Sequence, residues 1–293
     1  MSAPSAPAAT ERPEISGYGS GATDVVLSVD VVERAADELA TQRPDADRLE
    51  RLCAGSPFVA IDRLVAGYGR MEILHGLDLR VSQGQSLCLI GPNGAGKSTV
   101  LHSIQGFTHV MSGTIRVGGR DVTRMPAQRK LRDARIAYVL QDNSVFPDMS
   151  VEENLLMGGY LLPRSREARR AAERVLDRYP RLAERRRQRA AVLSGGERRL
   201  LEIARALIMD PSVLLIDEPS IGLEPRYIDK VFEILADLQR SERKTIVMVE
   251  QNAKKGLEFA DIGYVLVSGR IALAATGREL LDNPDVGRLF LGG

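Results

Sequence analysis

The chain has 293 residues, of which 44% are hydrophobic and 27% charged, as in a globular protein with one large or two modest domains. Its 40 basic and 39 acidic residues leave a formal charge of +1, which argues against a protein that coats a polyanion. No uninterrupted apolar run approaches the roughly 20 residues of a membrane-spanning helix, so we expect no bilayer crossing. The two cysteines, Cys53 and Cys88, are too few for a disulfide framework and fit a reducing cytoplasm.

Residues 1–57 differ in composition from the rest of the chain. Residues 1–23 are rich in Ala, Ser, Pro and Gly, which predicts a flexible segment, and they lack the basic stretch and apolar core of a secretory signal. Residues 24–53 contain a valine-rich run and then a charged stretch with spaced leucines, which fits a short strand or an amphipathic helix. We interpret residues 1–57 as a partly ordered N-terminal extension, with a docking element for a partner as the alternative.

A globular domain is predicted to begin at about residue 58. Residues 58–64 and 73–81 alternate apolar and polar side chains, as half-buried antiparallel strands do. Tyr68 lies between these two strands, flanked by glycines. An aromatic ring just ahead of a phosphate site can stack on an adenine base. An ordinary strand tyrosine is the alternative.

A glycine-rich turn joins a predicted strand at 86–90 to a segment with helical character at 100–105. Its glycines let the backbone turn tightly and aim several N–H groups at one point, where the helix start adds partial positive charge. Lys97 can reach the β- and γ-phosphates of a nucleotide, and the Ser98 hydroxyl can ligate Mg²⁺. The full G-x-x-x-x-G-K-[ST] pattern therefore predicts a nucleoside-triphosphate site formed by Gly91, Pro92, Asn93, Gly94, Ala95, Gly96, Lys97, Ser98 and Thr99.

Apolar runs that predict buried strands end at three polar sites, where ligand contacts are common. The first run is followed by Gln141, the second ends with Asp217 and Glu218, and the third is followed by Gln251. The Asp217 carboxylate can hold Mg²⁺ through water, while Glu218 can orient or deprotonate the attacking water.

The sequence LSGGE at 193–197 predicts a second anion site. Ser194 and Glu197 form a capping box, so a helix is expected to start here. Glycines in a helix cost roughly 1 kcal/mol each relative to alanine, so Gly195 and Gly196 need a purpose. Because they lack side chains, they let a ligand approach the exposed N–H groups closely. The site would lie on a helix separate from the one that follows the glycine-rich turn.

Residues 164–189 contain eleven arginines interspersed with acidic residues. Nucleic-acid binding is one interpretation of this run. Tyr179 is the only aromatic residue in it, so stacking platforms for bases are missing. We therefore favour a solvated helical face, which could lie near anionic lipid headgroups.

The order of these motifs resembles that of the ATP-binding-cassette ATPases over residues 58–293. LSGGE placed about twenty residues before an apolar strand ending in Asp-Glu is far more specific than a phosphate loop alone. The resemblance implies an α/β fold with a P-loop NTPase (RecA-like) core, an antiparallel β subdomain and a helical subdomain at about 142–195. The matching motifs are Tyr68, GPNGAGKST, Gln141, LSGGE, LLIDE at 214–218 and Gln251.

The resemblance also implies that ATP is bound between two chains. The phosphate loop of one chain would face the LSGGE helix of a second chain, so that the site is complete only in the dimer. Ser194, Gly195 and Gly196 would then contact the γ-phosphate, with Glu197 in the same motif, while Lys97 of the partner subunit holds the phosphates from the other side.

By the same resemblance, Ser98, Gln141 and Asp217 would surround Mg²⁺ and Glu218 would be the general base. Two positions depart from the family's usual pattern. Gln251 stands where most members have histidine, and an amide can donate a hydrogen bond to the γ-phosphate but cannot carry a proton at neutral pH. The usual Ser-Ala-Leu-Asp after the catalytic carboxylate is Ile-Gly-Leu-Glu at 221–224, which weakens inferences about contacts across the dimer at this loop.

Several segments narrow the resemblance to the ATPase subunits of branched-chain amino-acid importers, with urea or short-amide importers as close alternatives. These segments are VEQNA at 249–253, SVEENLLMGGY at 150–160, YPRLAERRRQRA at 179–190 and the terminal FLGG. The implied partners are two transmembrane permease subunits, a second identical or related ATPase and, indirectly, an extracellular substrate-binding protein.

The implied location is the cytoplasmic face of the cell membrane, with a coupling surface for a permease helix near 141–160. Two other function classes stay open at this point: an exporter ATPase, and a soluble cassette protein of translation or DNA repair. The latter usually has two cassettes or a long coiled-coil insertion, and this chain has one phosphate loop and no heptad run. No nucleic-acid partner is expected.

Overall fold

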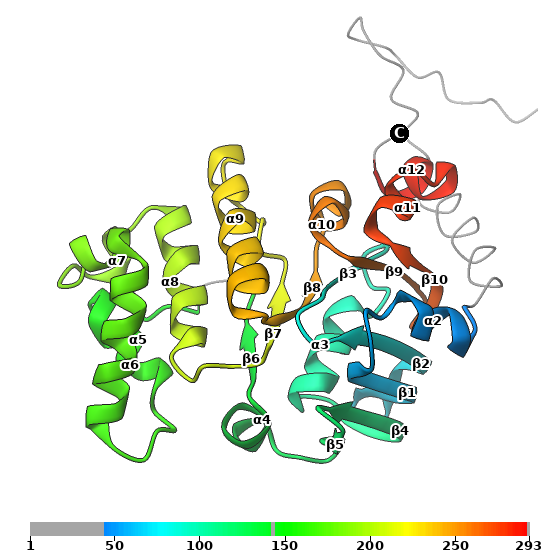
Figure 1. Ribbon diagram of the computed structural model, residues 1–293, viewed down its shortest axis with the longest axis horizontal. Helices are drawn as coiled ribbons and strands as arrows, with labels where there is room; N and C mark the ends of the chain where they lie inside the picture. Colours follow the sequence, from blue (N-terminus) through cyan, green and yellow to red (C-terminus); the bar gives the residue numbers. More distant parts are fainter. Residues whose placement is uncertain (1–43, 142–143, 292–293) are drawn as a thin grey trace, which may run out of the picture.

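The computed structural model describes residues 44–141 and 144–291, which form two sheets with a group of helices at one end (Figure 1). The flexible segment predicted at 1–23, the valine-rich run after it and the last two glycines lie outside the described residues. Within the described part of the extension, helix α2 (Ala46–Leu52) places Leu49 in the same core as the first sheet, with 2% of its surface exposed. Because this leucine is buried, α2 packs on the domain.

The first sheet is antiparallel, as the alternation of apolar and polar residues predicted. Its order in the described chain is β2–β1–β4–β5, and alternate side chains along β1 and β2 are buried. The strands are β1 (Pro57–Tyr68), β2 (Met71–Ser82), β4 (His109–Val117) and β5 (Arg120–Asp121).

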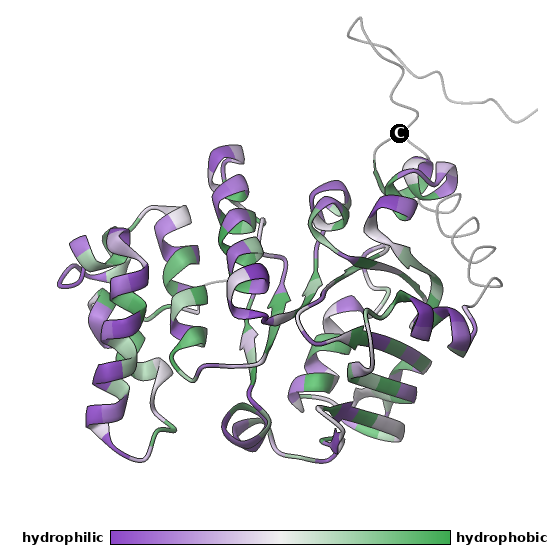
Figure 2. Cartoon of the chain, viewed as in Figure 1, coloured by the Kyte–Doolittle hydropathy of each residue, from purple (hydrophilic) through white to green (hydrophobic). Residues whose placement is uncertain are grey.

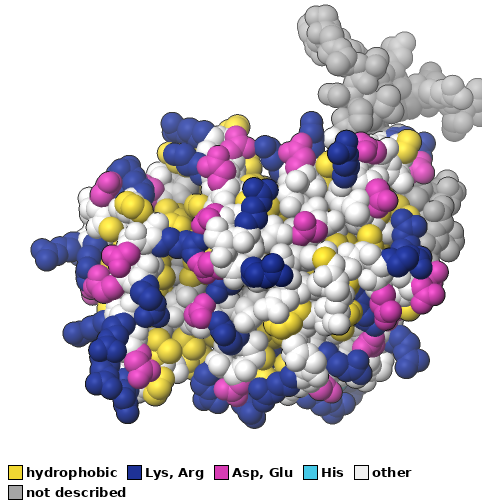
Figure 3. Space-filling model, in the orientation of Figure 1, with side chains coloured by type: hydrophobic (Ala, Val, Ile, Leu, Met, Phe, Trp, Pro, Cys, Tyr) yellow, Lys and Arg dark blue, Asp and Glu magenta, His cyan; other side chains and the backbone are white. Residues whose placement is uncertain are grey.

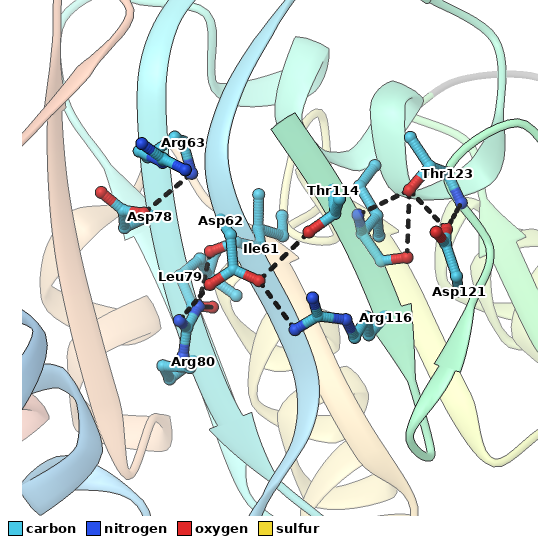
Figure 4. Close-up of polar contacts among 11 residues, drawn as sticks. Ile61, Asp62, Arg63, Asp78, Leu79, Arg80, Thr114, Arg116, Asp121 and Thr123 are labelled. Carbon is cyan, nitrogen blue, oxygen red and sulfur yellow. Dashed lines mark hydrogen bonds and ion pairs between the residues drawn. The ribbon is translucent and has the colours of Figure 1, made fainter. Parts of the chain in front are cut away.

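A partly exposed carboxylate ties three strands of this sheet together (Figure 4). Asp62 on β1 accepts hydrogen bonds from Arg80 on β2, and from Thr114 (3.2 Å) and Arg116 (3.1 Å) on β4. Arg80 also donates to the carbonyl oxygen of Ile61 at 2.5 Å. These bonds cross from β2 through β1 to β4, so they fix the sheet whose first strand ends at Tyr68.

The second sheet contains β3, the strand that leads into the glycine-rich turn. Its order in the described chain is β10–β9–β3–β8–β7–β6, with β10 antiparallel to β9 and the other neighbours parallel. Every residue of β3, β7 and β8 is buried because helices cover both faces, which explains their continuous apolar runs. The strands are β3 (Ser86–Ile90), β6 (Ile136–Val139), β7 (Val213–Asp217), β8 (Thr245–Val249), β9 (Ile262–Val267) and β10 (Arg270–Thr276).

Different helices cover the two faces of the parallel sheet, and their apolar sides face it (Figure 2). Helix α3 (Lys97–Gln105) buries Val100, Leu101 and Ile104 in the core that the parallel sheet shares with the antiparallel sheet. Helices α9 (Pro225–Glu242) and α10 (Ala253–Phe259) pack on the opposite face (Figure 1). The remaining helices of this part are α4 (Ala127–Ala134), α11 (Gly277–Leu281) and α12 (Pro284–Phe290).

A helical subdomain with its own apolar core stands at the end of the parallel sheet next to β6 (Figure 1). Its arginine-rich helix is amphipathic: Ala171, Ala172, Val175 and Leu176 are buried, while its arginines lie among the dark blue side chains at the left end of Figure 3. No helix among the described residues is long and apolar enough to cross a membrane. The subdomain contains α5 (Val151–Gly158), α6 (Ser165–Arg178), α7 (Pro180–Glu184), η1 (Ala190–Val192) and α8 (Gly195–Leu207).

Candidate nucleotide site

The glycine-rich turn connects β3 to α3 through backbone conformations that favour glycine. Gly91, Gly94 and Gly96 have φ angles of 148°, 80° and 97°, and Gly96 is the N-cap of α3 without a capping side chain. A Cβ atom at Gly91 would lie 2.1 Å from the carbonyl oxygen of Leu266 on β9. Any larger residue at Gly91 would therefore move the loop away from the sheet.

The ammonium group of Lys97 folds back over this loop. Its Nζ donates to the carbonyl oxygens of Gly91 (2.9 Å) and Pro92 (3.0 Å). Burial lowers the pKa of Lys97, and the negative charges of Glu218 and Asp217 oppose that shift. The loop thus holds a partly desolvated cation next to the start of α3, which is an arrangement that favours an anion.

A serine and a carboxylate meet where α3 begins and β7 ends. Ser98 Oγ lies 3.1 Å from Asp217 Oδ1, and the other oxygen of Asp217 accepts from the Tyr138 hydroxyl at 2.8 Å. In the part of the chain that the structure describes, no group of three or more His, Cys, Asp or Glu side chains could hold a metal alone. The oxygen pair of Ser98 and Asp217 nevertheless fits Mg²⁺, which is usually held by one or two carboxylates, waters and substrate phosphates.

The side chains of Gln141 and Glu218 also meet at this edge of the sheet. Gln141 Nε2 donates to Glu218 Oε2 at 2.8 Å. Glu218 has a φ angle of 42°, in the left-handed region that is rare for a residue with a side chain, and its N–H donates to the carbonyl oxygen of Val249 at 2.9 Å. Such outliers are concentrated at functional sites, where the surroundings hold them in place.

Tyr68 lies beside α3 with 44% of its surface exposed. Its hydroxyl is 2.5 Å from Nδ1 of His102, and the His102 ring packs at an angle on Tyr138, with ring centroids 5.6 Å apart. Burial lowers the pKa of His102, which favours the neutral ring next to the tyrosine hydroxyl. A line of aromatic rings therefore connects Tyr68 to the tyrosine that orients Asp217.

Gln251 is exposed at the end of the loop that follows β8. Its carbonyl oxygen accepts from the N–H of Ala253, and the next residue, Asn252, caps α10 through its side chain. The parallel strands β3, β7 and β8 are neighbours, so the structure brings the glycine-rich loop, Asp217, Glu218 and the Gln251 loop to one edge of the sheet.

The LSGGE motif forms the start of α8, as predicted. This helix is separate from α3, the helix that follows the glycine-rich loop. Ser194 and Glu197 form both bonds of a capping box, and Glu197 pairs with Arg181 (2.8 Å) and Arg185 (2.9 Å) of the helical subdomain. A Cβ atom at Gly196 would lie 2.3 Å from the Tyr227 ring. Helix α8 packs against α5 and α9, whereas α3 packs on the opposite sheet face, so within one chain the structure does not bring the two motifs together.

We did not predict a role for Arg199 from the sequence. This arginine on α8 is 5% exposed, pairs with Glu202 (2.8 Å), and donates to the carbonyl oxygens of Leu140 (2.6 Å) and Asp217 (3.0 Å). It therefore links the helix after LSGGE to the residues before Gln141 and to the end of β7. The sequence feature that could have indicated this role is an arginine and a glutamate three residues apart on the buried side of a helix.

The comparisons with known proteins define the family. The sequence profile described as "ABC transporter" matches residues 74–221. The high-affinity branched-chain amino acid transport ATP-binding protein BraG of Pseudomonas aeruginosa is 43% identical over 235 residues, which are 80% of this chain and 100% of that protein. The probable branched-chain amino acid transport ATP-binding protein LivF of Archaeoglobus fulgidus is 36% identical over 78% of this chain and 97% of its own length.

A crystal structure of the ADP conformation of an ATP-binding cassette of an ABC transporter superposes with a TM-score of 0.72 at 25% identity, over 82% of this chain and 100% of that one. The chain therefore belongs to the ABC transporter family and is one of its ATP-binding cassettes, an ATPase with a P-loop α/β fold. This confirms the fold class and the family predicted from the motif order.

Proposed function

We propose that this chain is the ATP-hydrolysing subunit of a membrane importer for branched-chain amino acids, bound at the cytoplasmic face of the membrane. The observation that carries the hydrolytic part is the meeting of Ser98 with Asp217 and of Gln141 with Glu218 beside the Lys97 loop. The cargo is inferred from the relatives, which are branched-chain amino acid transport ATP-binding proteins, because an ATPase of this kind does not touch the transported molecule.

In this proposal the glycine-rich loop holds the phosphates of ATP through its backbone N–H groups and Lys97. Tyr68 stacks on the adenine base. Ser98 and Asp217, with Gln141 nearby, would hold Mg²⁺, and the bound ion would supply positive charge to the phosphate oxygens. Lys97 gives up its two bonds to loop carbonyls when phosphate oxygens replace them.

Glu218 is placed to accept a proton from the attacking water. Its backbone is fixed to Val249 and its carboxylate is oriented by Gln141, so it can receive the proton without rearranging. Gln251 lies at the end of the neighbouring strand and would donate a hydrogen bond to the γ-phosphate, because its amide cannot act as a base.

We also propose that a second ATPase chain completes the site. Gly195 at the start of α8 is exposed, and α8 packs on the sheet face opposite to α3, the helix that follows the Lys97 loop. A γ-phosphate on the loop can meet such a helix start only if another chain brings it. Binding of ATP would then close the dimer, and hydrolysis would release it.

A groove next to Gln141 fits the permease partner. It has a volume of about 400 Å³ and lies between the end of β6 and helices α5 and α8. Leu140, Phe146 and Met157 are exposed in or beside it, with 44%, 42% and 40% of their surfaces accessible. An apolar patch of this kind next to a residue that contacts Glu218 suits a short permease helix that couples transport to hydrolysis.

Uptake by reconstituted vesicles tests the function directly. The full chain is co-purified with its permease subunits, reconstituted with the binding protein outside, and supplied with ATP on the side of the ATPase. We expect ATP-dependent uptake of leucine, isoleucine or valine, and none with the Lys97→Ala variant. Uptake of urea or short amides instead would replace the cargo assignment. ATP-driven export would contradict the assignment as an importer. Co-purification with nucleic acid in place of permeases would contradict the transport assignment.

A further inference from the structure

A buried carboxylate joins the loop after Glu218 to the loop that carries Gln251. Glu250 follows β8 and is 1% exposed. Its Oε1 accepts from the hydroxyl of Ser220 at 2.6 Å and from the N–H of Asn252 at 2.9 Å, and its Oε2 accepts from the N–H of Ser220 at 3.3 Å. The Glu250 side chain therefore connects two segments thirty residues apart in the sequence.

These three bonds explain why a carboxylate is stable in this place. A buried charge is costly unless donors surround it, and here the donors are one hydroxyl and two backbone N–H groups. The side chain is also tightly packed, because a Cβ atom at Gly256 would lie 3.0 Å from Glu250 Cβ and 2.6 Å from Cys88 Sγ. Glu250 can neither reach water nor move aside while α10 is in place, so it is a fixed point between the loops.

The segment that Glu250 holds contains the backbone outlier at Glu218. Two contacts anchor this segment to the end of β8: the N–H of Glu218 donates to Val249, and Ser220 donates twice to Glu250. A positive φ at a residue with a side chain is strained and persists when its surroundings fix it. The Ser220–Glu250 bonds supply part of that constraint.

The same carboxylate also fixes the loop of Gln251. The residue before Gln251 is Glu250 itself, and the residue after it, Asn252, donates its N–H to the Glu250 side chain. This turn sets the direction in which Gln251 leaves the sheet. One carboxylate thus bonds to the backbone of both loops that carry the proposed hydrolytic residues, Glu218 and Gln251.

We propose that Glu250 is a positioning residue for ATP hydrolysis, which holds Glu218 and Gln251 in register with each other through Ser220 and Asn252. The inference rests on the proposed function, since it concerns the same site. Glu250 is buried away from substrate and takes no part in the chemistry. Its loss should therefore lower the turnover number of hydrolysis and leave ATP binding by the Lys97 loop unchanged.

The test compares Ser220→Ala and Glu250→Gln with a matched control in the full chain. Ser86 is fully buried at the opposite end of β3, where its hydroxyl donates to Asp261 at 3.0 Å, so Ser86→Ala removes the same kind of serine–carboxylate bond away from the site. For each variant we measure kcat and KM for ATP, the Kd of a fluorescent ATP analogue, and the thermal midpoint.

We expect Ser220→Ala and Glu250→Gln to lower kcat about tenfold, which corresponds to about 1.4 kcal/mol, with Kd unchanged. Ser86→Ala should lower only the thermal midpoint. Because the Ser220–Glu250 bonds act through Glu218, adding Ser220→Ala to a Glu218→Gln chain should cause no further loss of turnover. This non-additivity would not arise from general destabilisation.

The inference is overturned if the two variants match Ser86→Ala in kcat, or if their loss appears in Kd with kcat intact. Lys97→Ala and Glu218→Gln separate this failure from failure of the proposed function. If those two abolish turnover while Ser220→Ala and Glu250→Gln do not, the inference about Glu250 alone is wrong. If Lys97→Ala and Glu218→Gln also leave turnover intact, the proposed function fails and this inference fails with it.

Discussion

Ser98 Oγ lies 3.1 Å from Asp217 Oδ1, which joins the first turn of α3 to the last residue of β7. The two residues are 119 positions apart, and the parallel strands β3, β8 and β7 between them bring them together. Tyr138 holds the second carboxylate oxygen of Asp217, and the proximity of that carboxylate contributes to a raised pKa of Tyr138 after the larger effect of burial. The carboxylate is thus oriented on both oxygens.

We predict that Ser98→Ala raises the Mg²⁺ concentration needed for half-maximal ATP turnover by about tenfold, because it removes one oxygen ligand. A titration of turnover with Mg²⁺ measures this. Ser103→Ala is the control, since Ser103 lies on the same helix and donates to the carbonyl oxygen of Thr99. Equal Mg²⁺ midpoints for Ser98→Ala and Ser103→Ala would show that Ser98 is not a metal ligand.

Glu218→Gln should lower ATP turnover by roughly 10²- to 10⁴-fold, the usual contribution of a general base, and preserve ATP binding. The amide keeps the size of the side chain but cannot accept a proton. Phosphate release and equilibrium nucleotide binding are measured on the same preparations. Glu258→Gln, an exposed substitution on α10, should leave both quantities unchanged. Full turnover by the Glu218 variant would remove this residue from the mechanism.

Substitutions of Tyr68 separate stacking from an ordinary structural role. Tyr68→Phe keeps the ring and loses only the hydroxyl that contacts His102, so ATP affinity should stay within a few-fold of the wild type. Tyr68→Ala should weaken ATP binding about tenfold or more, because base stacking on an aromatic ring contributes about 1–3 kcal/mol. Titration with a fluorescent ATP analogue gives both values. If both variants bind ATP equally well, Tyr68 is a strand residue without contact to the base.

One buried lysine should make a contribution to the stability of the fold that rises with pH. Lys130 is fully buried, its Nζ donates to the carbonyl oxygens of Ser103 (3.2 Å) and Ile104 (2.8 Å) at the end of α3, and burial lowers its pKa from 10.5 to about 8. Between pH 8 and 10.5 the unfolded chain binds more protons at this residue than the folded chain, so the contribution of Lys130 to the free energy of unfolding increases with pH.

The difference in the free energy of unfolding between the wild type and Lys130→Met should change by about 1 kcal/mol per pH unit in that window. Urea unfolding at several pH values measures the difference between the two chains, in which the contributions of other groups cancel. A difference that does not vary with pH between 8 and 10 would contradict the shifted titration of Lys130.

The phosphate loop, Asp217, Glu218 and the capping box at Ser194 could be predicted from the sequence because each is fixed by neighbours in the chain. Gly91 and Gly96 are required by local backbone angles, and Asp217 ends an apolar run. The roles of Arg199 and Glu250 could not be predicted in this way. Arg199 bonds to Leu140, 59 residues away, and Glu250 bonds to Ser220, 30 residues away. Only the folded sheet brings these residues together.

The role of the LSGGE motif depends on an arrangement that one chain cannot show. The structure shows that α8 packs away from α3, and the roles of Ser194, Gly195 and Gly196 at a shared site stay predictions. The measurement that tests them must therefore contain two copies of the chain.

Two differently tagged copies, one with Lys97→Ala and the other with Ser194→Phe, are co-expressed, and complexes that carry both tags are isolated for assay of ATP turnover. Each variant alone should be inactive, since every site in its dimer lacks either the lysine or an accessible helix start. The mixed dimer should recover about half of the wild-type turnover, because one of its two equivalent sites combines an intact loop with an intact Ser-Gly-Gly turn. A mixed dimer as inactive as its parents, or full turnover by the Ser194 variant alone, would contradict a site shared between two chains.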